Sequence, residues 1–343
     1  MIRALTAIGI AMVLALAVLG TETASAESSH DIGRIVLWPG MVEVRSGGHV
    51  VKSIDATVPL EFTALPDLVG DSAFVERRAD GTIDVHVPIE QRPGSRLAIT
   101  GGAVHQVRLI GGARLSGSSS ILSISNITVI GTGTIAGKRT ASSALIGYDG
   151  ASGVRMSRVH LVDDRSGTGA GRAVDLAGGQ LRIISALISG GAGAVRLNDV
   201  GSADVIGVQI EGSRGTGLAA GGATALLLRD VTVSGNAGDG LALSGRALRL
   251  TTGGEVALRH NHGLNLQLSR TRGLDVTHVR SETPGTAAQF ARAPGHRAVA
   301  RVNLAWPMAA GLILLLAAVA LEAIRARRDH DGIPVAPDYV LNR

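Results

Sequence analysis

The chain has 343 residues, of which 47 are glycine, none is cysteine and 45% are hydrophobic. This hydrophobic content excludes intrinsic disorder, and the glycines lack the three-residue period of collagen. Only 2% of the residues are aromatic, which argues against a stacking platform for single-stranded nucleic acid, so no nucleic-acid partner is predicted. The formal charge of +5, carried almost entirely by arginine, slightly favours acidic partners.

The N-terminus has the pattern of a secretory signal. Arg3 precedes an apolar run to about Leu19, and Ala24-Ser25-Ala26 has the small-x-small form of a cleavage site. We predict a signal peptide over residues 1–26, with an uncleaved membrane anchor as the alternative.

Residues 27–95 contain strand-like segments and one segment that suits a short helix, TALPDLVGDSAFVERR (63–78). They lack the repeat that dominates the rest of the chain. We expect this region to be a β-rich cap, because the first turn of a solenoid would otherwise leave an open apolar end.

Four consecutive segments share one rhythm of strand, small or amide residue, glycine and second strand. They start at Leu181, Ala203, Ala225 and Leu248, at intervals of 22 to 23 residues. Within each segment apolar and polar residues alternate, as in DVTVS (230–234), which is the period of a strand with one buried face. Self-similarity at this period predicts a solenoid of parallel strands.

One corner of the predicted coil repeats a glycine. Gly193, Gly215, Gly238 and Gly263 align there, and we expect a positive φ at this position. Two residues earlier the small or amide residues Gly191, Ser213, Asn236 and Asn261 align. We predict that these residues stack and satisfy backbone groups at the turn, which makes the asparagines structural.

With these coils and the upstream segments RLAITGG, VRLIGGARLSG and ILSISNITVIGTGTIAG, the chain resembles the right-handed parallel β-helix of pectate lyases, polygalacturonases and alginate epimerases. The resemblance implies an all-β, right-handed parallel β-helix solenoid over residues 96–290. The pair Asp163-Asp164 is similar to an Asp-Asp pair of polygalacturonases. The Asn-Thr-Asp, Gly-His-Gly and Arg-x-Lys elements of that family have no match, nor has the Asp-Pro-His-Asp motif of alginate epimerases, so the resemblance implies a fold more than an activity.

Loops that lengthen a coil are where solenoids place binding or catalysis. The coil from Val154 to Gln180 is longer than the coils that follow, with the surplus in residues 163–175, and the loop over 133–153 precedes it. The candidate catalytic residues of these loops are Asp163, Asp164, Arg165, His160 and Tyr148. The candidate substrate-binding residues are Lys138, Arg139, Asp149, Arg172 and Asp175.

Three kinds of chemistry suit these residues, and a solvated charged loop without a site is the alternative to all of them. Cations beside Tyr148 or His160 suit proton abstraction next to a uronate carboxylate, as in a polysaccharide lyase or uronate C5-epimerase. The pair Asp163 and Asp164 suits the acid and base of a glycosidase, or a Ca²⁺ ion. No cofactor and no defined metal site is predicted. Because the loop lies outside the coil, we expect substitutions in it to leave stability nearly unchanged.

The C-terminal part contains an apolar segment over residues 304–324, interrupted only by Glu322 and followed by Arg325, Arg327 and Arg328. Its length suits the hydrocarbon core of a bilayer, and its basic flank suits the cytoplasmic side. We predict a linker over 291–303, one transmembrane helix over 304–324 and a cytoplasmic tail over 325–343. A buried core helix is the alternative.

Together these features predict an exported single-pass membrane protein whose ectodomain acts on or binds an acidic polysaccharide of the envelope or the extracellular space. The alternative is a non-catalytic scaffold that holds glycan or envelope proteins at the membrane.

Overall fold

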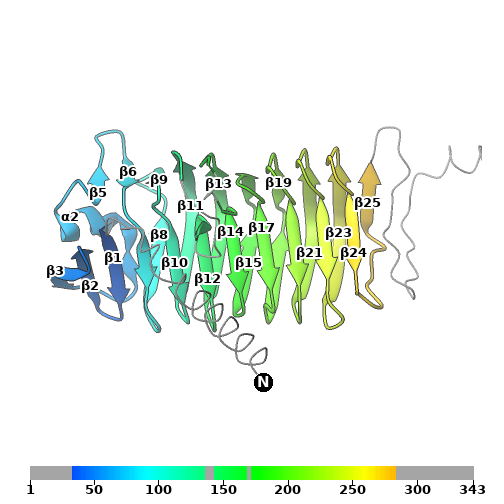
Figure 1. The fold of residues 1–343 in the computed structure, drawn as a ribbon, viewed down its shortest axis with the longest axis horizontal. Coiled ribbons are helices and arrows are strands. Elements are labelled where there is room, and N and C mark those ends of the chain that lie inside the picture. The colour runs from blue at the N-terminus through cyan, green and yellow to red at the C-terminus, as the bar shows by residue number, and fades with distance from the viewer. Residues whose placement is uncertain (1–32, 136–142, 168–170, 283–343) are drawn as a thin grey trace, which may run out of the picture.

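The computed structural model describes residues 33–135, 143–167 and 171–282 (Figure 1). The predicted signal peptide, the end of the predicted repeat domain, the linker, the transmembrane segment and the tail lie outside these residues. Within the described part of the chain, no helix is both long enough and apolar enough to cross a bilayer.

The chain winds into a right-handed parallel β-helix, as predicted (Figure 1). Eight parallel strands, one per coil, stack into the main part of an 11-stranded sheet, here called the first face. They are β7 (Ile89–Gln91), β10 (Leu115–Ser118), β12 (Ile146–Asp149), β14 (Val174–Ala177), β17 (Val195–Asn198), β20 (Leu218–Gly221), β22 (Leu241–Ser244) and β24 (Leu266–Ser269).

A 14-stranded sheet forms the rest of the wall and bends into a second and a third face. Strands confined to the second face are β8 (Arg96–Thr100), β15 (Gln180–Ile184) and β18 (Ser202–Ile206). Strands of the third face are β6 (Thr82–Val85), β9 (Gln106–Ile110), β16 (Leu187–Gly190), β19 (Gln209–Glu211) and β25 (Val279–Glu282). Four long strands cross both faces, β11 (Ile121–Thr132), β13 (Gly153–Asp163), β21 (Ala225–Ser234) and β23 (Arg249–Arg259). Asn126, Arg158 and Asp230 bend three of these strands with a positive φ.

The strand register confirms the repeat and corrects its phase. Leu181 pairs with Ala203, Ala203 with Leu226, and Leu226 with Leu250. The third and fourth coils therefore start one and two residues later than the pattern predicts, because the coils that begin at residues 181, 203 and 226 are 22, 23 and 24 residues long. The inward residues of all three faces form one continuous hydrophobic core. The coils also begin earlier than residue 96, since β6 and β7 already pair in parallel with β9 and β10.

The N-terminal region contains an antiparallel meander of β1 (Arg34–Trp38), β2 (Met41–Ser46) and β3 (His49–Asp55). Strand β1 joins the first face beside β7. The segment that suits a helix contains η1 (Phe62–Ala64) and α2 (Leu65–Val69), with β4 (Leu60–Glu61) before it and β5 (Val75–Arg77) after it. Phe62 and Leu65 are buried in the same core as the coils.

The predicted corner stack is present. Asn236 is fully buried; its Oδ1 accepts a hydrogen bond from the backbone N–H of Ser213 at 3.0 Å, and its Nδ2 donates to Asn261 Oδ1 at 2.8 Å. Asn261 in turn donates to Asn265 Oδ1 at 2.8 Å and to the Val233 carbonyl at 3.1 Å. The Asn236 side chain therefore bridges the coils on either side of it, and the Asn261 side chain satisfies groups of its own coil and of the preceding one.

The positive φ expected at the corner glycines was wrong. Positive φ occurs earlier in the turn, at Gly190, Gly212, Gly235 and His260, and not at the aligned glycines. Those glycines are needed because the coils approach so closely. A Cβ at Gly215 would lie 2.4 Å from the Ala192 carbonyl oxygen, and one at Gly238 would lie 2.8 Å from the Gly215 carbonyl carbon.

Asn236→Asp should destabilise the fold by about 1 to 3 kcal/mol, because the amide donor is lost and a carboxylate would face Asn261 Oδ1 without solvent. Denaturant unfolding of the purified chain measures the change. Gln180→Glu is the matched control, since it makes the same amide-to-carboxylate change at an exposed residue of β15. Equal effects of the two substitutions would contradict the structural role of the corner.

Candidate functional site

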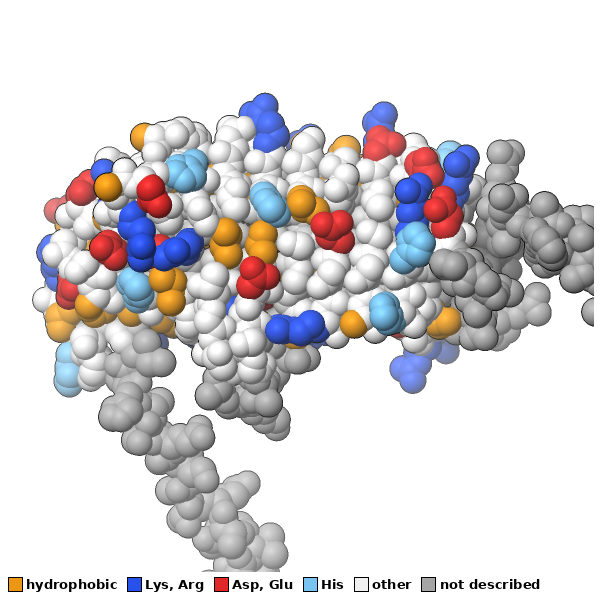
Figure 2. Space-filling view, turned by 90° about the horizontal axis from the view of Figure 1, so that it is seen from above, with side chains coloured by type: hydrophobic (Ala, Val, Ile, Leu, Met, Phe, Trp, Pro, Cys, Tyr) orange, Lys and Arg blue, Asp and Glu red, His pale blue; other side chains and the backbone are white. Residues whose placement is uncertain are grey.

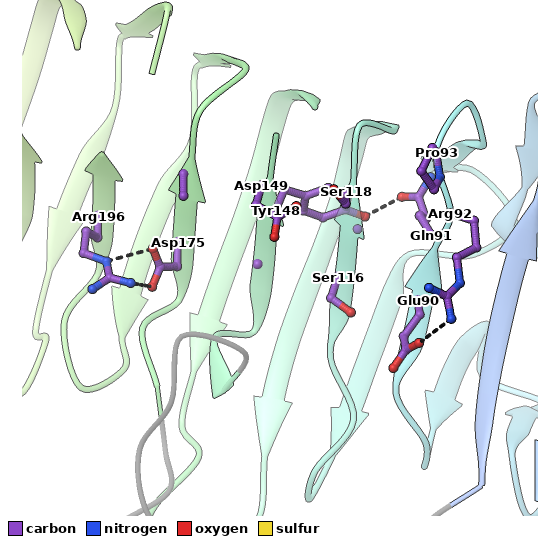
Figure 3. A pocket seen from close by; sticks show the side chains of 13 residues that line it. Glu90, Gln91, Arg92, Pro93, Ser116, Ser118, Tyr148, Asp149, Asp175 and Arg196 are labelled. Carbon is purple, nitrogen blue, oxygen red and sulfur yellow. Dashed lines mark hydrogen bonds and ion pairs between the residues drawn. The ribbon is translucent and has the colours of Figure 1, made fainter. Parts of the chain in front are cut away.

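The outer surface of the first face carries a groove. A cavity of about 370 Å³ extends over β7, β10, β12, β14 and β17, and a second of about 440 Å³ extends over β14, β17, β20, β22 and β24 (Figure 3). The two cavities share Ala177 and Arg196. They therefore adjoin at these two residues, and together they cross the coils along the axis of the solenoid.

The groove follows from small residues at outward positions. In each strand of the first face the first and third residues point into the core, and the second points outward. Strand pairing places these outward residues in one row, which contains Ser116, Gly147, Asp175, Arg196, Ala219 and Ala242. Glu90 and Gln267 occupy the two ends of the same row, so four of its eight side chains are small or absent, and the floor is shallow over β10, β12, β20 and β22.

Two charged residues in the middle of the row pair with each other. Arg196 on β17 donates from Nε to Asp175 Oδ1 at 2.8 Å and from Nη2 to Asp175 Oδ2 at 2.5 Å. Asp175 is only 8% exposed as a side chain, whereas Arg196 is 37% exposed. The pair therefore contributes little net charge, but it leaves part of the guanidinium open to the groove.

Tyr148 and Asp149 are adjacent on β12 and face opposite ways. The Tyr148 side chain is buried and donates its hydroxyl to Gln91 Oε1 inside the coil. Burial raises the pKa of this hydroxyl well above its ordinary value. Asp149 is exposed, lines the groove and has no ion pair among the described residues. A ligand in the groove can therefore contact Asp149, whereas the Tyr148 hydroxyl is buried and out of reach.

Asp163 and Arg165 form a second ion pair, away from the groove and inside the protein. Arg165 donates from Nε to Asp163 Oδ1 at 2.7 Å and from Nη2 to Oδ2 at 2.9 Å, and both side chains are fully buried. The expectation that this segment lies outside the coil core is therefore wrong for these two residues. Asp163 ends β13, and Arg165 turns back onto it.

The remaining predicted residues do not join one cluster. Asp164 is exposed next to the buried pair, and His160 is exposed on the third face, where its backbone pairs with Thr128 and Leu187. Arg172 is half-buried just before β14. Lys138 and Arg139 lie outside the described residues. Among the predicted set, the structure brings Tyr148, Asp149 and Asp175 to the groove.

Sequence reasoning missed Arg196, Glu90 and Arg92, which also line the groove. A signal for Arg196 was present, because AVRLN (194–198) aligns with AVDLA (173–177) and places Arg196 at the repeat position of Asp175. The groove residues occupy outward positions of short strands, whereas the sequence prediction was based on long loops.

One carboxylate and imidazole cluster lies apart from the groove. Ligand atoms of Glu76, Asp84 and His86 come within 4.8 Å of one another. Asp84 is already bound by Arg108, at 2.7 Å to each oxygen, and by Arg78. Burial opposes ionisation of Asp84, but these hydrogen bonds outweigh it and lower its pKa. The cluster is therefore a structural ion-pair network.

Figure 2 shows mixed groups of basic and acidic side chains near both ends of the face in view.

No protein-family model and no curated protein matches the chain. Among solved structures, a double mutant of the periplasmic alginate epimerase AlgG is similar, with 10% identity and a TM-score of 0.41, over 67% of this chain and 75% of that one. The AlgG structure without substitutions has 9% identity and a TM-score of 0.31, over 67% and 68%. No residue role follows from a likeness of this size.

Arg165→Ala should destabilise the fold by about 3 to 5 kcal/mol, because it leaves the Asp163 carboxylate buried without its partner. Thermal or denaturant unfolding measures the loss. Asp164→Asn is the control, since that side chain is exposed and its substitution should change stability little. Arg165→Ala with unchanged stability would show that the ion pair does not form.

The wild-type protein should lose stability at high pH because of Tyr148, and Tyr148→Phe should not show this part of the loss. The folded state raises the Tyr148 pKa, so folding is favoured fully below the unfolded pKa near 10, and stability falls as pH rises above that value. The variant should lack this part of the fall, while losing about 1 kcal/mol at neutral pH with the buried hydrogen bond. In a Tyr339→Phe chain, which leaves Tyr148 as the sole tyrosine, tyrosinate absorbance should appear only as the protein unfolds. Its appearance near pH 10 in folded protein would contradict the burial.

Proposed function

We propose that the chain binds an extended polysaccharide of the envelope or the extracellular space along the groove of the first face. The observation that carries the proposal is the continuity of the two cavities from β7 to β24. Strands about 4.8 Å apart over eight coils make a floor roughly 34 Å long, which suits a linear polymer better than a small molecule.

The groove walls offer hydrogen bonds of the kind that sugar hydroxyls use. Ser118, Asn198 and Ser244 occupy the fourth position of their strands and line the cavities. The half-open guanidinium of Arg196 adds charged donors, which supports an acidic polysaccharide as the ligand. Binding to envelope proteins through the same ectodomain is the alternative.

Binding is favoured over catalysis because acids and bases do not converge on this floor. The residues lining the two cavities include no histidine. The Tyr148 hydroxyl is turned inward, and the Asp163 carboxylate is occupied by Arg165. A lyase or epimerase mechanism through Tyr148 or His160 has no support from this geometry.

A glycosidase is the second candidate, supported by one observation. Asp149 and Asp175 line the same cavity from adjacent strands, and glycosidases use two carboxylates on either side of the scissile bond. Asp149 is the exposed member of this pair, whereas Arg196 binds both oxygens of Asp175. For either function we propose export and anchoring through residues 304–324, which would hold the groove outside the cytoplasm.

Ala242→Trp should weaken polysaccharide binding by about tenfold or more, because an indole at this outward position fills the second cavity. Titration calorimetry with the purified full chain, against neutral and acidic linear polysaccharides, measures the effect. Gln209→Trp is the matched control, since Gln209 is exposed on the third face and should tolerate the same side chain.

Equal affinity of the two variants would contradict a ligand in the groove. The same samples report the second candidate through new reducing ends. Hydrolysis that falls about 100-fold in Asp149→Asn but persists in Asp164→Asn would favour the glycosidase. Absence of reducing ends from the wild-type chain, with binding intact, would exclude hydrolysis of the polymers used.

A further inference from the structure

The lining of the groove ends at β7 with Arg92 and Pro93, and β1 is the next strand of the sheet. Leu37 of β1 pairs in parallel with Gln91 of β7, so Trp38 lies beside Arg92. The Trp38 side chain is 36% exposed, and the guanidinium of Arg92 stacks over its ring, 5.5 Å from the centroid. Further along the same row of positions the residues include Ser118, Ala177 and Gly221. A polymer lying along these positions would meet the indole of Trp38 at this end.

Positive charge exceeds negative charge around this end. Glu90 contacts Arg34 at 3.5 Å and Arg92 at 3.8 Å, so neither contact is a close ion pair. Glu90 also acts on a third guanidinium, because it raises the pKa of Arg114 although burial lowers that pKa more. Glu43, the next carboxylate, is bound by Arg45 at 2.7 Å. Glu90 therefore contacts two arginines, and the charge of Glu90 also acts on a third.

Arg92 retains hydrogen-bonding capacity that the described protein does not use. Its Nε is buried and has no hydrogen-bond partner in the described part of the chain. The side chain lines the groove beside Pro93 and next to Glu90 (Figure 3). The buried Nε is closed to a ligand, but the side chain is 40% exposed and its Nη2 lies 3.8 Å from Glu90, so this end of the guanidinium can bind an anion such as a carboxylate.

We propose that Trp38 and Arg92 form a subsite for the end of the polysaccharide, which stacks the terminal sugar ring on the exposed part of the indole and binds a carboxylate on that sugar through Arg92. This inference rests on the proposed function of the groove and names the chemistry at its end. The ligand is accordingly a glycan whose terminal residue is a uronic acid or an equivalently carboxylated sugar.

The experiment uses Trp38 as its own reporter. The chain has two tryptophans, so the full-length Trp306→Phe protein fluoresces from Trp38 alone. Short linear oligomers of a uronic acid are titrated against it, together with the same oligomers after reduction of their carboxyls to alcohols. The acidic oligomers should change Trp38 fluorescence and bind about tenfold or more tightly than the reduced ones, as expected for one charge-assisted contact.

Two variants in the Trp306→Phe background distinguish binding at the terminal subsite from binding along the rest of the groove. Arg92→Gln should abolish the preference for acidic oligomers, whereas Arg182→Gln, on an exposed residue of the second face, should preserve it. Circular dichroism confirms that each variant is folded. Long polymer should still bind Arg92→Gln along the rest of the groove.

The outcomes are distinguishable. In one of them, Ala242→Trp weakens binding while Trp38 fluorescence does not change and Arg92→Gln has no effect. This result would overturn the terminal subsite but would still support binding in the groove. A preference for acidic oligomers that survives Arg92→Gln would also overturn it. Failure of every glycan to bind would overturn the function of the groove and the subsite together.

Discussion

The structure depends on one constraint, the parallel register of backbone hydrogen bonds from coil to coil. That register places equivalent residues directly above one another about 4.8 Å apart, so every side chain must tolerate its own counterparts. The corner shows the consequence most clearly. Asn236 and Asn261 satisfy each other and the turn backbone, and glycine is retained where a Cβ would meet the carbonyl group of the coil below. Core, corner and groove are three results of the same stacking.

The same register explains how charge is arranged. Asp175 and Arg196 occupy one repeat position on neighbouring coils, so their pairing follows from the alignment of two strands. Asp163 and Arg165 pair differently, within a single turn and under full burial. The first pair leaves a guanidinium partly open to a groove, and the second closes a turn. Similar residues in nearby segments thus have different roles because one pair faces outward and the other faces the core.

The sequence was sufficient for the fold, since alternation within strands and a period of 22 to 23 residues left few alternatives to a parallel solenoid. It also predicted the amide stack at Asn236, because identical polar residues at one repeat position must meet. The site was harder to predict. Successive side chains of a strand point to opposite faces, so a shift of one residue decides whether Asp163 or Asp149 faces solvent. The groove is built from strands of about four residues, whereas the prediction relied on long loops. Arg92 is only two residues from Glu90, but Arg34 and Arg114 come from distant parts of the chain, and no local pattern joins these two to Glu90.

The floor of the groove is assembled from units that are nearly interchangeable. Leu218 and Leu241 hold the same place in successive coils, so the segment 218–240 contributes one rung and little else to the site. Gain or loss of such a segment would lengthen or shorten the floor by one step while β7, β14 and β17 kept their charged residues. On the proposed function, the number of coils would set the length of ligand that the groove covers, and duplication within the gene would alter that length without changing the contacts at its end.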